Sequence, residues 1–95
     1  MMSVTYQEAI NELSAEAREM HRAIVSLTEE LEAVDWYNQR ADVCSDPELK
    51  AIMLHNRDEE KEHAAMLLEW IRRRDPIISK EMKDYLFTDK PVAHN

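Results

Sequence analysis

The sequence predicts an all-α protein: an antiparallel two-helix hairpin followed by a short C-terminal helix, with two hairpins joining into a four-helix bundle. Three observations support this prediction. The 95 residues contain no glycine and many strong helix formers, a composition that disfavours tight β-hairpin turns. Apolar residues recur at steps of three and four, the spacing of one helix face. Two breakpoints with proline divide the chain into helical lengths.

The first helix is expected over about residues 6–42, behind a lead-in of residues 1–5. It should stop before Pro47, because Ser45 and Glu48 have the spacing of a capping box and Pro47 suits the first turn of a new helix. Its apolar seam consists of Ile10, Leu13, Ala17, Met20, Ile24, Leu27, Leu31 and Val34.

The second helix is expected over about residues 47–74 and a third over about residues 76–87, with Asp75 as the cap between them. The tail, residues 88–95, is expected to be loose. The seam of the second helix consists of Leu49, Ile52, Met53, Leu67, Trp70 and Ile71.

The short connector makes the two long helices antiparallel neighbours. Two helices cannot bury both apolar seams, so each chain represents half of a core that a second copy completes.

Composition excludes several classes of function. The net charge is −8, from 20 acidic and 12 basic residues, and an acidic surface repels nucleic acid while attracting metal cations. No apolar run approaches the length of a membrane span, and the N-terminus does not resemble a signal peptide. Cys44 is the only cysteine, which suits a reducing cytoplasm. Acidity alone, however, is explained by solubility.

Charged residues interrupt both seams. Glu30 is the single charged member of its stripe on the first helix, and Glu60 and His63 replace two consecutive apolar positions on the second. A buried unpaired carboxylate is costly, so something must compensate these groups. One answer is a shared cation; the other is a buried polar network that sets the register of a non-enzymatic helical scaffold or adaptor.

The spacing favours a metal. Glu60 and His63, three residues apart, lie on one helix face. A Glu-x-x-His pair with a lone Glu on a neighbouring helix is half of the ligand set of ferritin-like di-iron bundles. A two-fold axis would duplicate Glu30, Glu60 and His63 and so hold two metal ions. Such ligands suit Fe(II), and also Mn or Zn. A different di-metal enzyme, a hydrolase or a manganese protein that consumes peroxide, is the remaining alternative.

Four residues near Glu30 on the first helix are further candidates. Tyr37, seven residues later on the same stripe, is either a hydrogen bonder or redox-active phenol near the metals or a packing residue. Glu29 and Glu32, together with Asp35, either concentrate cations toward the site or form a solvated acidic face. On the second helix, a possible peripheral metal site, or simply surface, consists of His55, Glu59 and Glu62.

Two long strings resemble those of the encapsulated ferritins. They are Glu-Glu-Leu-Glu-Ala-Val-Asp-Trp-Tyr at residues 29–37 and His-Asn-Arg-Asp-Glu-Glu-Lys-Glu-His-Ala-Ala-Met at residues 55–66. The similarity runs from about residue 21 to residue 87 and includes Leu68-Glu69-Trp70 and Tyr85-Leu86-Phe87.

The resemblance implies a two-helix protein related to half a ferritin, assembled as a decamer, a ring of five dimers, inside an encapsulin shell in the cytoplasm. It implies a ferroxidase that oxidises Fe(II) to Fe(III) with O2, while the shell stores the mineral. Two irons would bind at each dimer interface, and Ca, Mn or Zn would substitute.

By the same resemblance, Glu30, Glu60 and His63 match the ferroxidase ligands, with Glu60 bridging the two irons, and Tyr37 matches the nearby tyrosine. Glu29 and Glu32 match a site that attracts ions before oxidation. A peripheral metal site is matched by His55, Glu59 and Glu62.

The sequence departs from the family at one point. Members usually carry a C-terminal shell-targeting peptide, and none is evident up to Pro91-Val92-Ala93-His94-Asn95. Either the sequence is shortened or targeting works differently, so residence in a shell is an expectation from the resemblance.

Overall fold

A computed structural model describes residues 6–94 of the chain. A short 3-10 helix, η1 (Ile10–Glu12), precedes two long helices, α1 (Ala15–Val43) and α2 (Pro47–Arg74), and a short helix α3 (Pro76–Tyr85). The described residues contain no strand, so the prediction of an all-helical hairpin with a third short helix is confirmed. The predicted lead-in, residues 1–5, and Asn95 lie outside the described residues.

Local caps explain the helix ends. Asp46, in an extended conformation, caps α2 by accepting a hydrogen bond from the Leu49 backbone N–H at 2.8 Å, and Pro47 occupies the first turn. Asp75 caps α3 by accepting from the N–H groups of Ile77 and Ile78 at 3.0 Å each. The expected role of Asp75 is therefore confirmed, whereas the capping box expected at Ser45 is wrong, because Asp46 is the cap.

The first helix is shorter than expected. It begins at Ala15 rather than near Tyr6, because Ser14 is extended (φ −67°, ψ 163°) and its side chain accepts a hydrogen bond from Ala17 N at 3.1 Å. The segment before it folds back, and the Tyr6 ring stacks on the His21 ring of α1 with centroids 3.9 Å apart.

The third helix ends at Tyr85 rather than Phe87, since Leu86 is already extended (φ −98°, ψ 148°) and Phe87 takes a left-handed conformation with φ 56°. The tail, expected to be loose, folds back on this helix end. The His94 ring stacks on the Tyr85 ring at 4.4 Å, its Nε2 lies 3.0 Å from the Asp84 carbonyl oxygen, and the Tyr85 hydroxyl donates to the His94 carbonyl oxygen. We call this arrangement the tail clasp.

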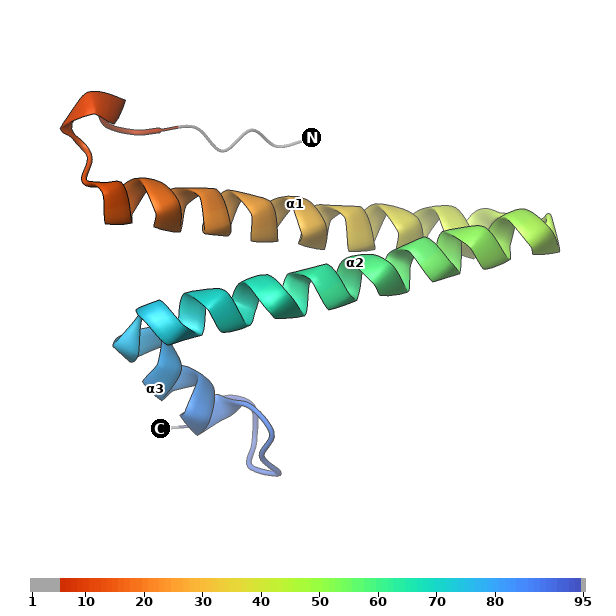
Figure 1. Ribbon diagram of the computed structural model, residues 1–95. Coiled ribbons are helices and arrows are strands. Elements are labelled where there is room, and N and C mark those ends of the chain that lie inside the picture. Colours follow the sequence, from red (N-terminus) through yellow and green to blue (C-terminus); the bar gives the residue numbers. More distant parts are fainter. Residues whose placement is uncertain (1–5, 95) are drawn as a thin grey trace.

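Helices α1 and α2 are antiparallel; they lie close together at the connector and spread apart toward the other end (Figure 1). The side chains buried between the elements are few and mostly small: Ala23, Ala41, Ala64 and Ile71. Large apolar residues remain exposed on both long helices, among them Leu31 at 54%, Ile52 at 53% and Met66 at 59%. A single chain therefore leaves much of its apolar seams uncovered.

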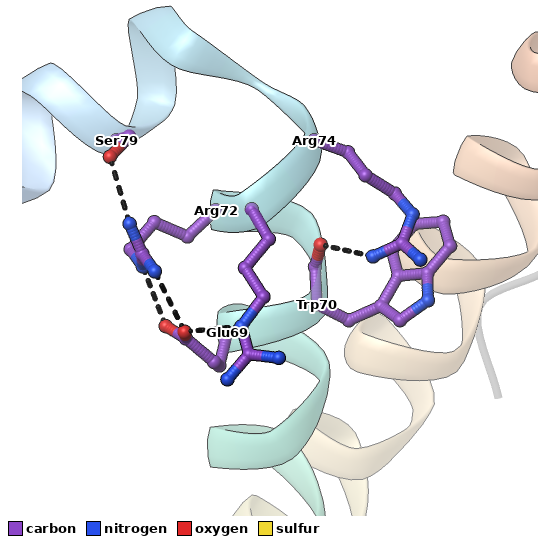
Figure 2. Close-up of polar contacts among 6 residues, drawn as sticks. Glu69, Trp70, Arg72, Arg74 and Ser79 are labelled. Atoms are coloured by element: carbon purple, nitrogen blue, oxygen red, sulfur yellow. Dashed lines mark hydrogen bonds and ion pairs between the residues drawn. The ribbon is translucent and has the colours of Figure 1, made fainter.

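An ion-pair network joins α2 to α3 (Figure 2). Arg72 donates from Nε and Nη2 to the Glu69 carboxylate at 2.6 and 2.8 Å and from Nη1 to Ser79 Oγ at 3.1 Å. Arg73 donates from Nε to the same carboxylate at 2.7 Å. Hydrogen bonds from Arg72 and then Arg73 lower the pKa of Glu69 to about 2. The network holds the first turn of α3 against the last turns of α2.

Candidate metal centre

Three ligand-type side chains converge between α1 and α2. Glu30 comes from α1, and Glu60 and His63 come from α2; one ligand atom from each lies within 4.8 Å of the others. His63 Nδ1 is 3.4 Å from Glu30 Oε2 and 3.4 Å from Glu60 Oε2. Within the described part of the chain, this is the one cluster of three such residues. We call it the triad.

The helices position these side chains for simple reasons. Glu60 and His63 share a face of α2 because they are three residues apart. Glu30 reaches them across the helix contact because the residues buried nearby are small alanines, Ala23 on α1 and Ala64 on α2, and interaxial distance depends on side-chain size at the contact.

The triad is poorly satisfied without a cation. A single imidazole nitrogen faces two carboxylates, and both distances, 3.4 Å, exceed those of ordinary N–H···O hydrogen bonds. Glu30 Oε2 is shielded from solvent and finds no hydrogen-bond partner among the described residues. The side chains are 24% (Glu30), 25% (Glu60) and 42% (His63) exposed. Two carboxylates and one imidazole, partly open to one side, fit Fe(II), Mn or Zn.

A groove of about 560 Å³ leads away from the triad between the diverging helices. Glu30 and His63 line one part of it, and Leu67 and Trp70 line the continuation toward the end of α2. Trp70 belongs to the apolar seam predicted for the second helix. It follows His63 by seven residues, which is two helical turns on the same face, and the structure places both side chains along one groove.

Tyr37 is half-buried on α1, and its ring lies 5.5 Å from the Arg40 guanidinium. Its hydroxyl makes no hydrogen bond to the triad within the described chain. The hydrogen-bonding role expected for Tyr37 therefore stays a prediction.

The flanking candidates do not gather into clusters of three in the described chain. Glu29 is exposed and Glu32 is half-buried. On α2, His55 Nε2 lies 3.3 Å from Glu59 Oε1 on an exposed face, while Glu62 is exposed. A single chain thus forms only the His55–Glu59 pair of the expected peripheral site.

Comparison with known proteins adds independent findings. The sequence model of the EncFtn-like family matches residues 5–89. The chain is 59% identical over 86 residues to a protein of Rhodospirillum rubrum named encapsulated ferritin-like protein, covering 90% of this chain and 61% of that one. It thus spans less than two thirds of that relative's length.

Two further relatives and one solved structure are also similar to this chain. Identity is 50% over 92 residues to a ferritin-like protein of Thermotoga maritima, covering 97% of this chain and 81% of that protein. It is 41% over 59 residues to an encapsulin nanocompartment cargo protein of Myxococcus xanthus, covering 61% of this chain and 45% of that one. A crystal structure of a Nitrosomonas europaea protein matches with a TM-score of 0.91 and 73% identity, covering 94% and 98% of the two chains.

Proposed function

Because this chain belongs to the EncFtn-like family of encapsulated ferritin-like proteins, we propose that it is a ferroxidase, which oxidises Fe(II) to Fe(III) with O2 at a di-iron site formed between two copies. The observation that carries the proposal is the triad, which brings Glu30, Glu60 and His63 within 4.8 Å. The iron is the substrate, and the protein supplies its ligands.

The proposed assembly follows from what one chain leaves incomplete. The exposed seam residues of α1 and α2 need a covering layer, and a two-fold related hairpin supplies one with matching chemistry. The result is a four-helix bundle with two copies of each ligand. A ring of five such dimers is the decamer that the family resemblance suggests.

Charge balance supports a pair of ferrous ions. Two copies of Glu30 and Glu60 carry four negative charges, and two Fe(II) ions carry four positive charges. Neutralising these charges offsets the repulsion among four carboxylates placed together. His63 must bind through a neutral ring nitrogen, so metal binding competes with protons.

The proposed reaction removes one electron from each Fe(II). A pair of ions transfers two electrons to O2, which takes up two protons to form peroxide, and leaves two Fe(III). Glu60 would bridge the ions and Tyr37 would lie beside them, as the resemblance suggests. Glu29 and Glu32 would attract Fe(II) toward the site, and the face carrying His55, Glu59 and Glu62 would bind ions peripherally.

We also propose that the protein works as cargo of an encapsulin shell, where the ferric product is stored as mineral. This rests on the names of its relatives, one called encapsulated and another called an encapsulin cargo protein. No helix in the described part of the chain is long and apolar enough to cross a bilayer.

An anaerobic titration with Fe(II), followed by air, tests the proposal. We expect saturable uptake of two irons per dimer and then ferric absorbance. Native mass spectrometry should show iron pairs on dimers or larger assemblies, because each chain holds half the ligands. Iron pairs on isolated monomers would contradict the shared site.

A second candidate function has one observation in its favour. An imidazole placed between two carboxylates at 3.4 Å also suits a polar network that fixes dimer register in a scaffold. A scaffold would take up no stoichiometric Fe(II) and give no ferric absorbance. Repeating the titration with Mn and peroxide distinguishes a different di-metal enzyme from the ferroxidase and from the scaffold.

A further inference from the structure

Both tryptophans of the chain lie against an arginine four residues later in the sequence. The Arg74 guanidinium carbon lies 3.8 Å from the Trp70 ring centroid, and Nη1 donates to the Trp70 carbonyl oxygen at 3.2 Å (Figure 2). The Arg40 guanidinium lies 5.9 Å from the Trp36 ring and 5.5 Å from the Tyr37 ring. Each of these rings therefore has a cation near it.

The charge of these two arginines is not neutralised by a carboxylate. Four other arginines pair with carboxylates, namely Arg22, Arg57, Arg72 and Arg73. Across residues 6–94, no ion pair involves Arg40 or Arg74. Neither guanidinium therefore has a carboxylate in direct contact, and the nearest acidic side chains at Arg74 are those that line the pocket with it and Trp70, Glu16 and Glu19 among them.

The rings lie where one-electron chemistry is expected. Trp70 lines the same groove as Glu30 and His63. Trp36 and Tyr37 follow Glu30 on α1 by six and seven residues, about two helical turns. Tryptophan and tyrosine are the side chains in this neighbourhood most readily oxidised by electron loss.

We propose that Arg74 and Arg40 protect these rings from oxidation while iron is oxidised, an inference that rests on the proposed ferroxidase function. The oxidant is the peroxide that the iron reaction forms, activated by Fe(II). One electron leaves the indole or phenol and reduces that oxidant, and the ring N–H or O–H proton passes to water. A fixed positive charge beside the ring raises the energy of the radical cation that forms first.

The distances predict a graded effect. Coulomb's law with the dielectric constant of water gives about a sixfold suppression of electron loss for a charge at 3.8 Å. The same law gives about a fourfold suppression of electron loss for a charge at 5.5 Å. Arg74 should therefore protect Trp70 more strongly than Arg40 protects Trp36 and Tyr37.

The test begins with metal-free protein, so that it does not depend on the iron reaction. Photoexcited ruthenium(II) tris(bipyridine) gives an electron to a cobalt(III) ammine, and the ruthenium(III) formed takes one electron from an aromatic ring. The ring radical then combines with dissolved O2, and peptide mass spectrometry measures the oxidised fraction at each ring. The variants are Arg74→Gln, which removes the charge, and Arg74→Lys, which keeps it.

Arg73→Gln is the matched control. It removes the same charge from the adjacent residue, which pairs with Glu69, whereas the cation over the Trp70 ring is Arg74. The control therefore reproduces any change in attraction of the cationic ruthenium reagent. We expect Arg74→Gln to raise oxidation at Trp70 about sixfold, with Trp36 unchanged. Arg74→Lys and the control should stay near the wild-type rate.

Equal oxidation of Trp70 in Arg74→Gln and Arg73→Gln would overturn the proposal. So would an Arg74→Lys variant as sensitive as Arg74→Gln, because the protection would then come from steric cover. Under Fe(II) and air, Arg74→Gln should accumulate oxidised Trp70 about six times as fast as wild type does. Ferric absorbance without that difference would refute the protective role, whereas absence of ferric absorbance would refute the ferroxidase function itself.

Discussion

Replacing Glu60 by glutamine isolates the metal-binding role of one triad carboxylate. The substitution preserves size and helix propensity but removes the negative charge of one of the three ligands that lie within 4.8 Å of each other. In metal-free protein the substitution should lower the free energy of unfolding only a little, by about 1 kcal/mol or less. The contact of His63 with Glu60 is long at 3.4 Å, and removing the Glu60 charge also relieves its repulsion with Glu30.

With metal, the difference should be large. A ligand present at 100 times its Kd stabilises the folded protein by about 2.7 kcal/mol. In a domain of this size each kcal/mol raises Tm by about 4–8 °C, so wild type should gain about 10–20 °C. Losing a direct ligand should raise Kd at least about 100-fold. The same metal concentration then stabilises the folded variant by only about 0.4 kcal/mol, which raises its Tm by about two to three degrees.

The assay is thermal unfolding followed by circular dichroism at constant protein concentration, with Fe(II) under anaerobic conditions or with redox-inert Zn(II). Glu81→Gln, the same change on exposed α3, is the control and should respond to metal as wild type does. A Glu60→Gln variant that keeps the full metal-dependent rise in Tm and normal ferric absorbance would refute the assignment of Glu60 as a ligand.

Three further predictions concern the fold. Ile71→Ala should cost about 2–4 kcal/mol in denaturant unfolding, because Ile71 is 4% exposed and its loss leaves a cavity; a loss below 1 kcal/mol would contradict this. Glu69 has a folded pKa of about 2 against an ordinary 4.5, so its contribution to stability is present above pH 4.5 and disappears as the pH falls through about 2. The Tm difference between wild type and Glu69→Gln should shrink over that range, and a constant difference would argue against the ion pairs. His94→Ala should open the tail clasp and speed amide exchange after Tyr85 about tenfold, with α1 unaffected; unchanged exchange would show that the clasp carries no stability.

Much of the fold could be predicted from local signals. The break at Pro47 and the cap at Asp75 both depend on chemistry within a few residues of the helix end, and both lie where they were predicted. The start of α1 was missed because the apolar period continues through Leu13 although Ser14 forms a cap. A serine before Ala-Glu-Ala was the available signal.

Other features were not readable from local pattern. The left-handed conformation of Phe87 is uncommon for a residue that is not glycine, and nothing in its neighbours indicates it. The tail clasp depends on a contact between Tyr85 and His94, which are nine residues apart across a turn. Whether two residues at that separation touch depends on the conformation of the chain between them, which helical periodicity does not give.

The candidate site shows the same division. That Glu60 and His63 share a face, and that Glu30 interrupts an apolar stripe, follows from helical periodicity and needs only the sequence. Whether Glu30 meets them depends on the rotation and separation of two helices, which the packing of Ala23, Ala41 and Ala64 sets. The sequence by itself determined which side chains each helix presents, because that is a property of one helix. Only the tertiary structure decided the 4.8 Å grouping, because distances between helices arise from side chains that pack across them.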